Sequence, residues 1–140
     1  VGDVMLDKYY FGKVERISPE APVPIVNIVT EESRLGGASN VANNITSLGG
    51  QATLCGAIGY DFFGKEIERM AHRKGIKTDF VKTEQPTITK ARIIGGRQQI
   101  VRIDYEQHLE LSEKEKIFKS ILPHSSKSSL PLLFLIMEKA

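Results

Sequence analysis

Two adjacent glycines, Gly36 and Gly37, stand directly before a segment with helical periodicity. Five apolar residues of that segment recur at helical spacing: Ala38, Val41, Ala42, Ile45 and Leu48. Glycine lets a ligand approach the backbone closely, and the first N–H groups of a helix have no partner within it. Asn40 adds an amide that can both donate and accept hydrogen bonds. The pattern predicts a site for a polar molecule at the start of a helix.

Composition gives the frame for that site. A chain of 140 residues, 41% hydrophobic and 26% charged, is typical of one globular domain or part of one. A net charge of +2 without basic runs argues against a nucleic-acid partner. The lone Cys55 lies in an apolar run, which favours a buried thiol and a reducing, cytoplasmic compartment. We see no signal peptide, and the apolar run at 130–137 is shorter than the roughly 20 residues that cross a membrane.

The elements that must position the site alternate between strand and helix. We expect strands near 1–6, 51–58 and 76–81, and helices over 38–48 and 61–73, the latter capped by Asp61. Ser112 and Glu115 predict one more helix start. This alternation favours an α/β fold with a mainly parallel, doubly wound sheet.

Two further β-rich runs, 87–94 and 97–104, are separated by Gly95-Gly96 and predict a hairpin. With 23–29 they would form a small separate sheet, a lid over one edge of the body. A turn at the two glycines places Lys90 and Arg92 on one face and Arg102 on the other.

The glycine motif resembles that of the ribokinase-like (PfkB) carbohydrate kinases. The segment 36–42, followed by Gly49 and Gly59, matches in residues and spacing. Further stretches, 2–7, 16–24, 89–92 and 98–104, resemble the branch of that family that acts on D-glycero-D-manno-heptose 7-phosphate.

The resemblance implies a ribokinase-like doubly wound fold with a small β lid. It implies that ATP, with Mg²⁺, phosphorylates the anomeric hydroxyl of the sugar phosphate on the way to ADP-heptose and lipopolysaccharide. It also implies a homodimer formed through the lid. No zinc or other metal-ligand cluster can be built from the three histidines and Cys55, and we expect no membrane partner.

By the same resemblance, Asp7 binds sugar hydroxyls and Gly36, Gly37 and Asn40 contact the sugar. A carboxylate accepts two hydroxyl donors well, which suits Asp7. The alternatives are a solvated turn for Asp7 and a helix cap for Asn40.

A phosphorylated sugar also needs cations. Lys90, Arg92 and Arg102 on the hairpin are candidates for the phosphate, with Arg16, Arg34 and Arg97 weaker ones. The alternative is that they are ordinary charges on a sheet edge.

The resemblance covers residues 1–122, the sugar-binding and lid part, and stops before the divergent segment 123–140. The family's catalytic aspartate, in a Gly-Ala-Gly-Asp motif, is not among these residues, so we expect an N-terminal fragment without activity of its own. Two other readings stay open: a ribokinase-family kinase for another sugar, and a non-catalytic module that dimerises through the lid.

Overall fold

The computed structural model describes residues 1–106 together with residues 115 and 119. Eight elements follow one another along the chain: β1 (Val4–Ile17), β2 (Pro24–Gly37), α1 (Ala38–Ser47), β3 (Thr53–Gly59), α2 (Phe62–Arg73), β4 (Lys77–Thr83), β5 (Ile88–Gly95) and β6 (Gln98–Tyr105). The helix expected after Ser112 and the boundary expected at 122/123 lie outside the described residues.

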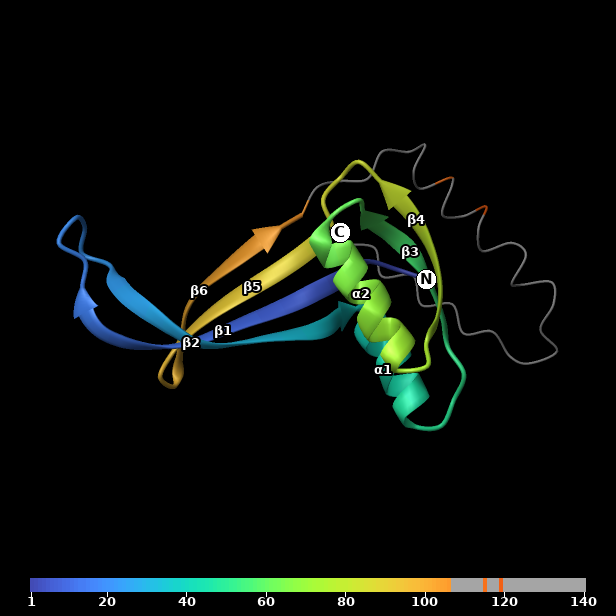
Figure 1. Cartoon of the computed structure of the whole chain (residues 1–140), viewed down its shortest axis with the longest axis horizontal. Coiled ribbons are helices and arrows are strands. Elements are labelled where there is room, and N and C mark those ends of the chain that lie inside the picture. Colours follow the sequence, from blue (N-terminus) through green and yellow to red (C-terminus); the bar gives the residue numbers. More distant parts are fainter. Residues whose placement is uncertain (107–114, 116–118, 120–140) are drawn as a thin grey trace.

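Four strands form one mixed sheet in the order β2-β1-β5-β6, which we call the lid sheet. β1 runs antiparallel to β2 and parallel to β5, and β6 returns antiparallel to β5. β3 and β4 form a parallel pair beside the two helices. In Figure 1 the lid sheet reaches away from the body made by α1, α2, β3 and β4. The mixed α/β fold with parallel strands agrees with the sequence prediction.

The expectation of a lid sheet separate from the first strand is wrong. β1 is one strand of 14 residues that starts in the core, where Val4 and Leu6 are buried, and ends in the exposed lid. It pairs with β2 from Val4↔Gly37 to Ile17↔Pro24, interrupted by two irregularities. From Met5 to Gly12, β1 has a neighbour on both sides, so the polar residues Asp7 and Lys8 do not end the strand. Body and lid therefore share a continuous strand.

The core lies where the start of β1 meets β3 and the helices. Its members are buried apolar side chains: Val4, Leu6, Leu35, Ala38, Ala42, Leu54, Ile58, Ile67, Ala71 and Ile76. Asp61 caps α2, as the sequence predicts, by accepting a hydrogen bond from Gly64 N at 2.7 Å. Cys55, 3% exposed, is buried as expected.

The hairpin of β5 and β6 has a different register from the one predicted. The turn residues are Gly96, with φ of +63°, and Arg97. Gly95 pairs with Gln98, but Arg92 pairs with Arg102, so Ile100 is an extra residue in β6. Moving the turn by one position shifts the register by two residues, which leaves every side chain of β6 on the same face of the sheet. One bulged residue, in contrast, places every later side chain of β6 on the opposite face. Arg102 therefore lies on the same face as Lys90 and Arg92, and its predicted place on the opposite face is wrong.

Candidate functional site

An ion pair at the base of the lid sheet joins two of the predicted site residues. Asp7 Oδ1 on β1 accepts a hydrogen bond from Arg92 Nη1 on β5 at 2.6 Å. Both side chains are mostly enclosed, at 20% and 22% exposure. The hydrogen bond with the Asp7 carboxylate raises the pKa of the Arg92 guanidinium. The sequence predicted roles for both residues but not their contact.

The glycine doublet makes room for this carboxylate. A Cβ atom on Gly36 would lie 2.6 Å from Asp7 Oδ2 and 2.9 Å from Met5 Cγ. Gly37 has φ of +54°, and a Cβ there would lie 2.5 Å from the carbonyl oxygen of Asp3. A side chain at either position would push β1 and β2 apart where β2 turns into α1. The two glycines thus shape the site through the backbone.

The start of α1 borders the same region. Its N-terminal cap position is Gly37, which offers no side-chain hydrogen bond. Asn40 is exposed in the first turn. Among the described residues, Ser39 Oγ and Asn43 Oδ1 are buried side-chain atoms with no hydrogen-bond partner. These two atoms lie one helical turn apart, on the same side of α1, and sequence patterns gave no reason to separate them from ordinary helix residues.

The other two predicted cations lie near Arg92. Lys90 is the register partner of Asp7, and Arg102 is the register partner of Arg92. Each has its own acid: Lys90 Nζ lies 3.9 Å from Glu106, and Arg102 Nε lies 2.9 Å from Asp104. With Asp7 these residues form what we call the charged face of the lid sheet. The structure brings all three predicted cations together on it.

Tyr9 and Arg34 complete the charged face. The guanidinium carbons of Arg34 and Arg92 lie 4.7 and 5.2 Å from the centre of the Tyr9 ring, so two cations stack on one aromatic side chain. Arg34 also pairs with Glu32 at 2.7 Å, which raises the pKa of its guanidinium. The sequence carried a signal for Tyr9, which is two residues after Asp7 in a strand and so shares its face.

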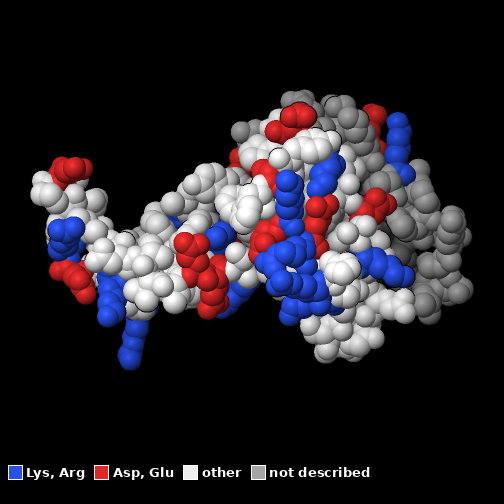
Figure 2. Space-filling model, viewed as in Figure 1, with Lys and Arg blue, Asp and Glu red and all other residues white. Residues whose placement is uncertain are grey.

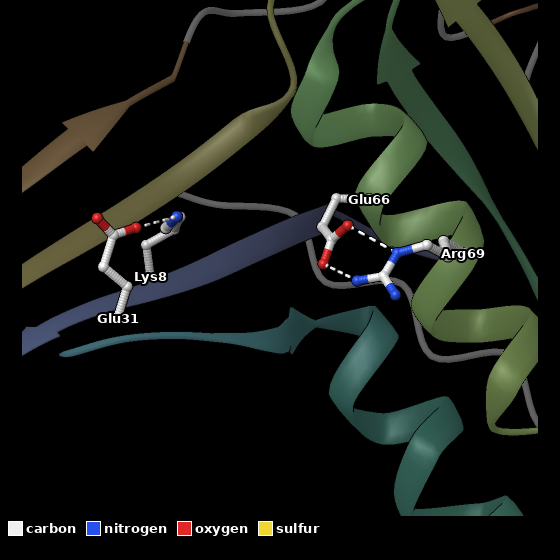
Figure 3. A network of polar contacts seen from close by, with 4 residues as sticks. All are labelled: Lys8, Glu31, Glu66 and Arg69. Atoms are coloured by element: carbon white, nitrogen blue, oxygen red, sulfur yellow. Dashed lines mark hydrogen bonds and ion pairs between the residues drawn. The ribbon is translucent and has the colours of Figure 1, made fainter.

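The opposite face of the lid sheet is turned toward α2 (Figure 3). Lys8 pairs with Glu31 at 3.2 Å, and its ammonium lies 6.0 Å from the centre of the Phe63 ring. On α2, the hydrogen bond from Arg69 holds the pKa of Glu66 below its usual value, and the Lys8 charge adds to the effect. At Lys8 this face therefore seats the lid on the body, while its part on β6 is exposed.

Charges over α2 are mixed in sign. Figure 2 shows basic side chains there with acidic side chains between and beside them. In residues 1–106, with 115 and 119, no three His, Cys, Asp or Glu side chains are grouped to hold a metal ion. No helix of that part is long and apolar enough to span a bilayer.

Comparison with known proteins decides the family. The model of the pfkB family of carbohydrate kinases matches residues 1–129. The chain belongs to the pfkB carbohydrate kinase family. A D-beta-D-heptose 7-phosphate kinase of Bordetella bronchiseptica is 49% identical over 134 residues, covering 95% of this chain and 43% of that protein. A bifunctional protein HldE of Pelobacter propionicus is 48% identical over 114 residues, covering 80% and 23%. The chain thus spans less than half the length of these relatives.

Solved structures agree on the fold. A phosphofructokinase-like protein from Staphylococcus aureus superposes with a TM-score of 0.69 at 18% identity, covering 85% of this chain and 37% of that one. Phosphofructokinase-2 from Escherichia coli, in a complex with fructose-6-phosphate, gives a TM-score of 0.67 at 18% identity, covering 86% and 39%. At this identity the likeness establishes the ribokinase-like fold alone.

Proposed function

We propose that the protein containing this chain is an ATP-dependent kinase that phosphorylates the anomeric hydroxyl of D-glycero-D-manno-heptose 7-phosphate, for ADP-heptose and lipopolysaccharide synthesis. The observation that carries the proposal is the charged face. On it, Asp7 pairs with Arg92, and Lys90 and Arg102 lie beside them with Glu106 and Asp104 as their own partners. A phosphorylated sugar offers both partners, hydroxyl donors for the carboxylate and an anion for the cations. The names of the relatives point to the same substrate class.

In this proposal Asp7 accepts hydrogen bonds from sugar hydroxyls. Asn40 and the backbone at Gly36 and Gly37 contact the sugar from the start of α1. Lys90 and the two arginines hold the 7-phosphate, because a guanidinium binds phosphate oxygens bidentately. ATP supplies the transferred group, and Mg²⁺ neutralises its phosphates. We assign no described residue to Mg²⁺, since that part of the chain groups no set of metal ligands.

The test is a substrate panel on the full-length gene product, with ADP release as the readout. Heptose 7-phosphate should be used at least tenfold better, by kcat/KM, than heptose, ribose or fructose 6-phosphate. Better use of fructose 6-phosphate or ribose would favour a ribokinase-family kinase for another sugar. If none of these sugars gives ADP release above background, the proposal is overturned.

We also propose that the protein is a cytoplasmic homodimer associated through the lid sheet. Val101, Ile103 and Tyr105 on β6 are 44%, 39% and 53% exposed, and they alternate on one face of an edge strand. Exposed apolar side chains on a sheet edge favour pairing with another chain. Light scattering should give a dimer that Ile103→Asp converts to a monomer. A dimer that forms without binding any sugar phosphate would favour the non-catalytic module instead, and a wild-type monomer would refute this part.

A further inference from the structure

Asp7 and Arg92 are hydrogen-bonded to each other in the structure. The 2.6 Å hydrogen bond uses Asp7 Oδ1 and Arg92 Nη1, the groups on which the proposed function depends for sugar and for phosphate. Asp7 Oδ2 lies over Gly36, where a Cβ atom would approach it to 2.6 Å. Oδ1 is therefore the oxygen whose acceptor capacity Arg92 uses, and its release gives Asp7 a second free oxygen for a pair of sugar hydroxyls.

Resting on that proposed function, we propose that the Asp7–Arg92 pair is a latch that the phosphate of the substrate opens. The phosphate takes the Arg92 guanidinium from Asp7, and the freed carboxylate then accepts the sugar hydroxyls. The phosphate group thereby contributes to recognition in two ways. It binds Arg92 directly, and it frees Asp7 to bind the sugar hydroxyls.

Charge and burial favour this exchange in one direction. A phosphate monoester carries between one and two negative charges near neutral pH, whereas Asp7 carries one, so the phosphate competes well for the guanidinium. Hydroxyls without a phosphate would have to displace Arg92 and leave a mostly enclosed guanidinium without an acid. Removing one partner of such a pair is costly, because the other charge stays desolvated. The latch itself therefore weakens the binding of unphosphorylated sugars.

The other cations of the charged face differ from Arg92 in their partners. Arg102 pairs with Asp104 and Lys90 with Glu106, acids on β6 or just after it to which the proposed function gives no part. Arg92, by contrast, pairs with Asp7, the proposed sugar-binding carboxylate. The Tyr9 ring, 5.2 Å away, gives Arg92 a second contact that does not depend on Asp7. Arg92 can thus leave Asp7 without leaving the site.

The experiment compares heptose 7-phosphate with heptose, by calorimetric binding and by kcat/KM, in the full-length protein and its variants. Arg92→Ala should weaken binding of heptose 7-phosphate about tenfold or more, because a charged hydrogen bond is lost. It should also strengthen binding of heptose severalfold, because Asp7 is no longer occupied. The matched control is Arg102→Ala, which should weaken binding of the phosphorylated sugar without any gain for heptose.

A second measurement needs no variant. Inorganic phosphate at millimolar concentration should increase the affinity of the wild-type protein for heptose, since it opens the latch without being part of the sugar. In Arg92→Ala this effect should vanish. If Arg92→Ala gives no gain for heptose, or phosphate only competes with the sugar, the latch is refuted while the kinase assignment stands. If neither sugar is phosphorylated by the wild type, the proposed function itself fails.

Discussion

Asp61 lies at the junction of three segments of the body, and its removal should lower the stability of the protein strongly. Its carboxylate accepts hydrogen bonds from Gly64 N, Thr87 N and Thr87 Oγ1, each at 2.7 Å. Thr87 is 2% exposed, and its hydroxyl oxygen also accepts from Gly59 N at 2.9 Å. Asp61 therefore links the start of α2 to the start of β5, and through the Thr87 hydroxyl to the end of β3.

The expected loss for Asp61→Ala follows from these contacts. Losing a helix N-cap costs about 1 kcal/mol, and leaving the buried Thr87 N–H without an acceptor adds about 2 kcal/mol. We therefore expect a decrease of about 3 kcal/mol in the free energy of unfolding, measured by urea denaturation of the full-length protein. Asp104→Ala is the control, because it breaks a partly exposed pair worth less than about 1 kcal/mol.

The same contacts predict a pH dependence. Burial opposes ionisation of Asp61, but the hydrogen bonds from Gly64 and Thr87 outweigh it and hold the carboxyl pKa below its usual value. A lowered pKa in the folded state stabilises the protein above the unfolded pKa of about 4, and this stabilisation is lost as the pH falls further. The stability difference between wild type and Asp61→Asn should therefore shrink below about pH 4.

Hydrogen exchange gives the decisive readout for Asp61. The amides of Gly64 and Thr87 should lose protection in Asp61→Ala, while amides in the middle of β1 keep more of theirs. A loss in unfolding free energy below about 1 kcal/mol with unchanged protection at both amides would refute the reasoning, because the carboxylate would then not be holding the three segments.

Three further outcomes are expected. Gly36→Ala should lower kcat/KM for the sugar phosphate about tenfold or more, because a Cβ atom 2.6 Å from Asp7 Oδ2 must displace that carboxylate. Unchanged kinetics would mean that Asp7 does not act in the site. The thiol of Cys55 should react with Ellman's reagent only on unfolding, since it is 3% exposed and burial, with Asp79 nearby, raises its pKa; rapid native labelling would contradict this. Lys8→Met should lower the melting temperature only slightly, because the ion pair with Glu31 is partly exposed. It should also increase amide hydrogen exchange in β1. Unchanged hydrogen exchange would show that Lys8 does not seat the lid.

Much of the site was predictable because its patterns are local. The glycine doublet, the α2 cap at Asp61 and the strand runs each depend on residues a few positions apart. The buried state of Cys55 followed from its apolar neighbours in the same way. The family resemblance rested on motifs of this kind, and the match of the pfkB family model over residues 1–129 confirms it.

The predictions were wrong where a single extra residue in a strand changes the face on which later side chains lie. The bulge at Ile100 puts Arg102 beside Arg92, and a bulge leaves no composition signal in a run of β-forming residues. The length of β1 was underestimated for a related reason. A polar stretch such as Asp7-Lys8 continues as a strand when both its edges are paired, and the pairing partners lie far along the chain.

The sequence by itself determined the family, the glycine-led start of α1 and the set of polar residues available to the site, because these are written in short-range spacing. Only the tertiary structure decided which of those residues touch. Asp7 and Arg92 are 85 positions apart, and their contact exists because β1 and β5 pair in one register and not the next. Register sets the face of every side chain in a sheet, and it depends on which face of each strand is buried and on the turns between strands.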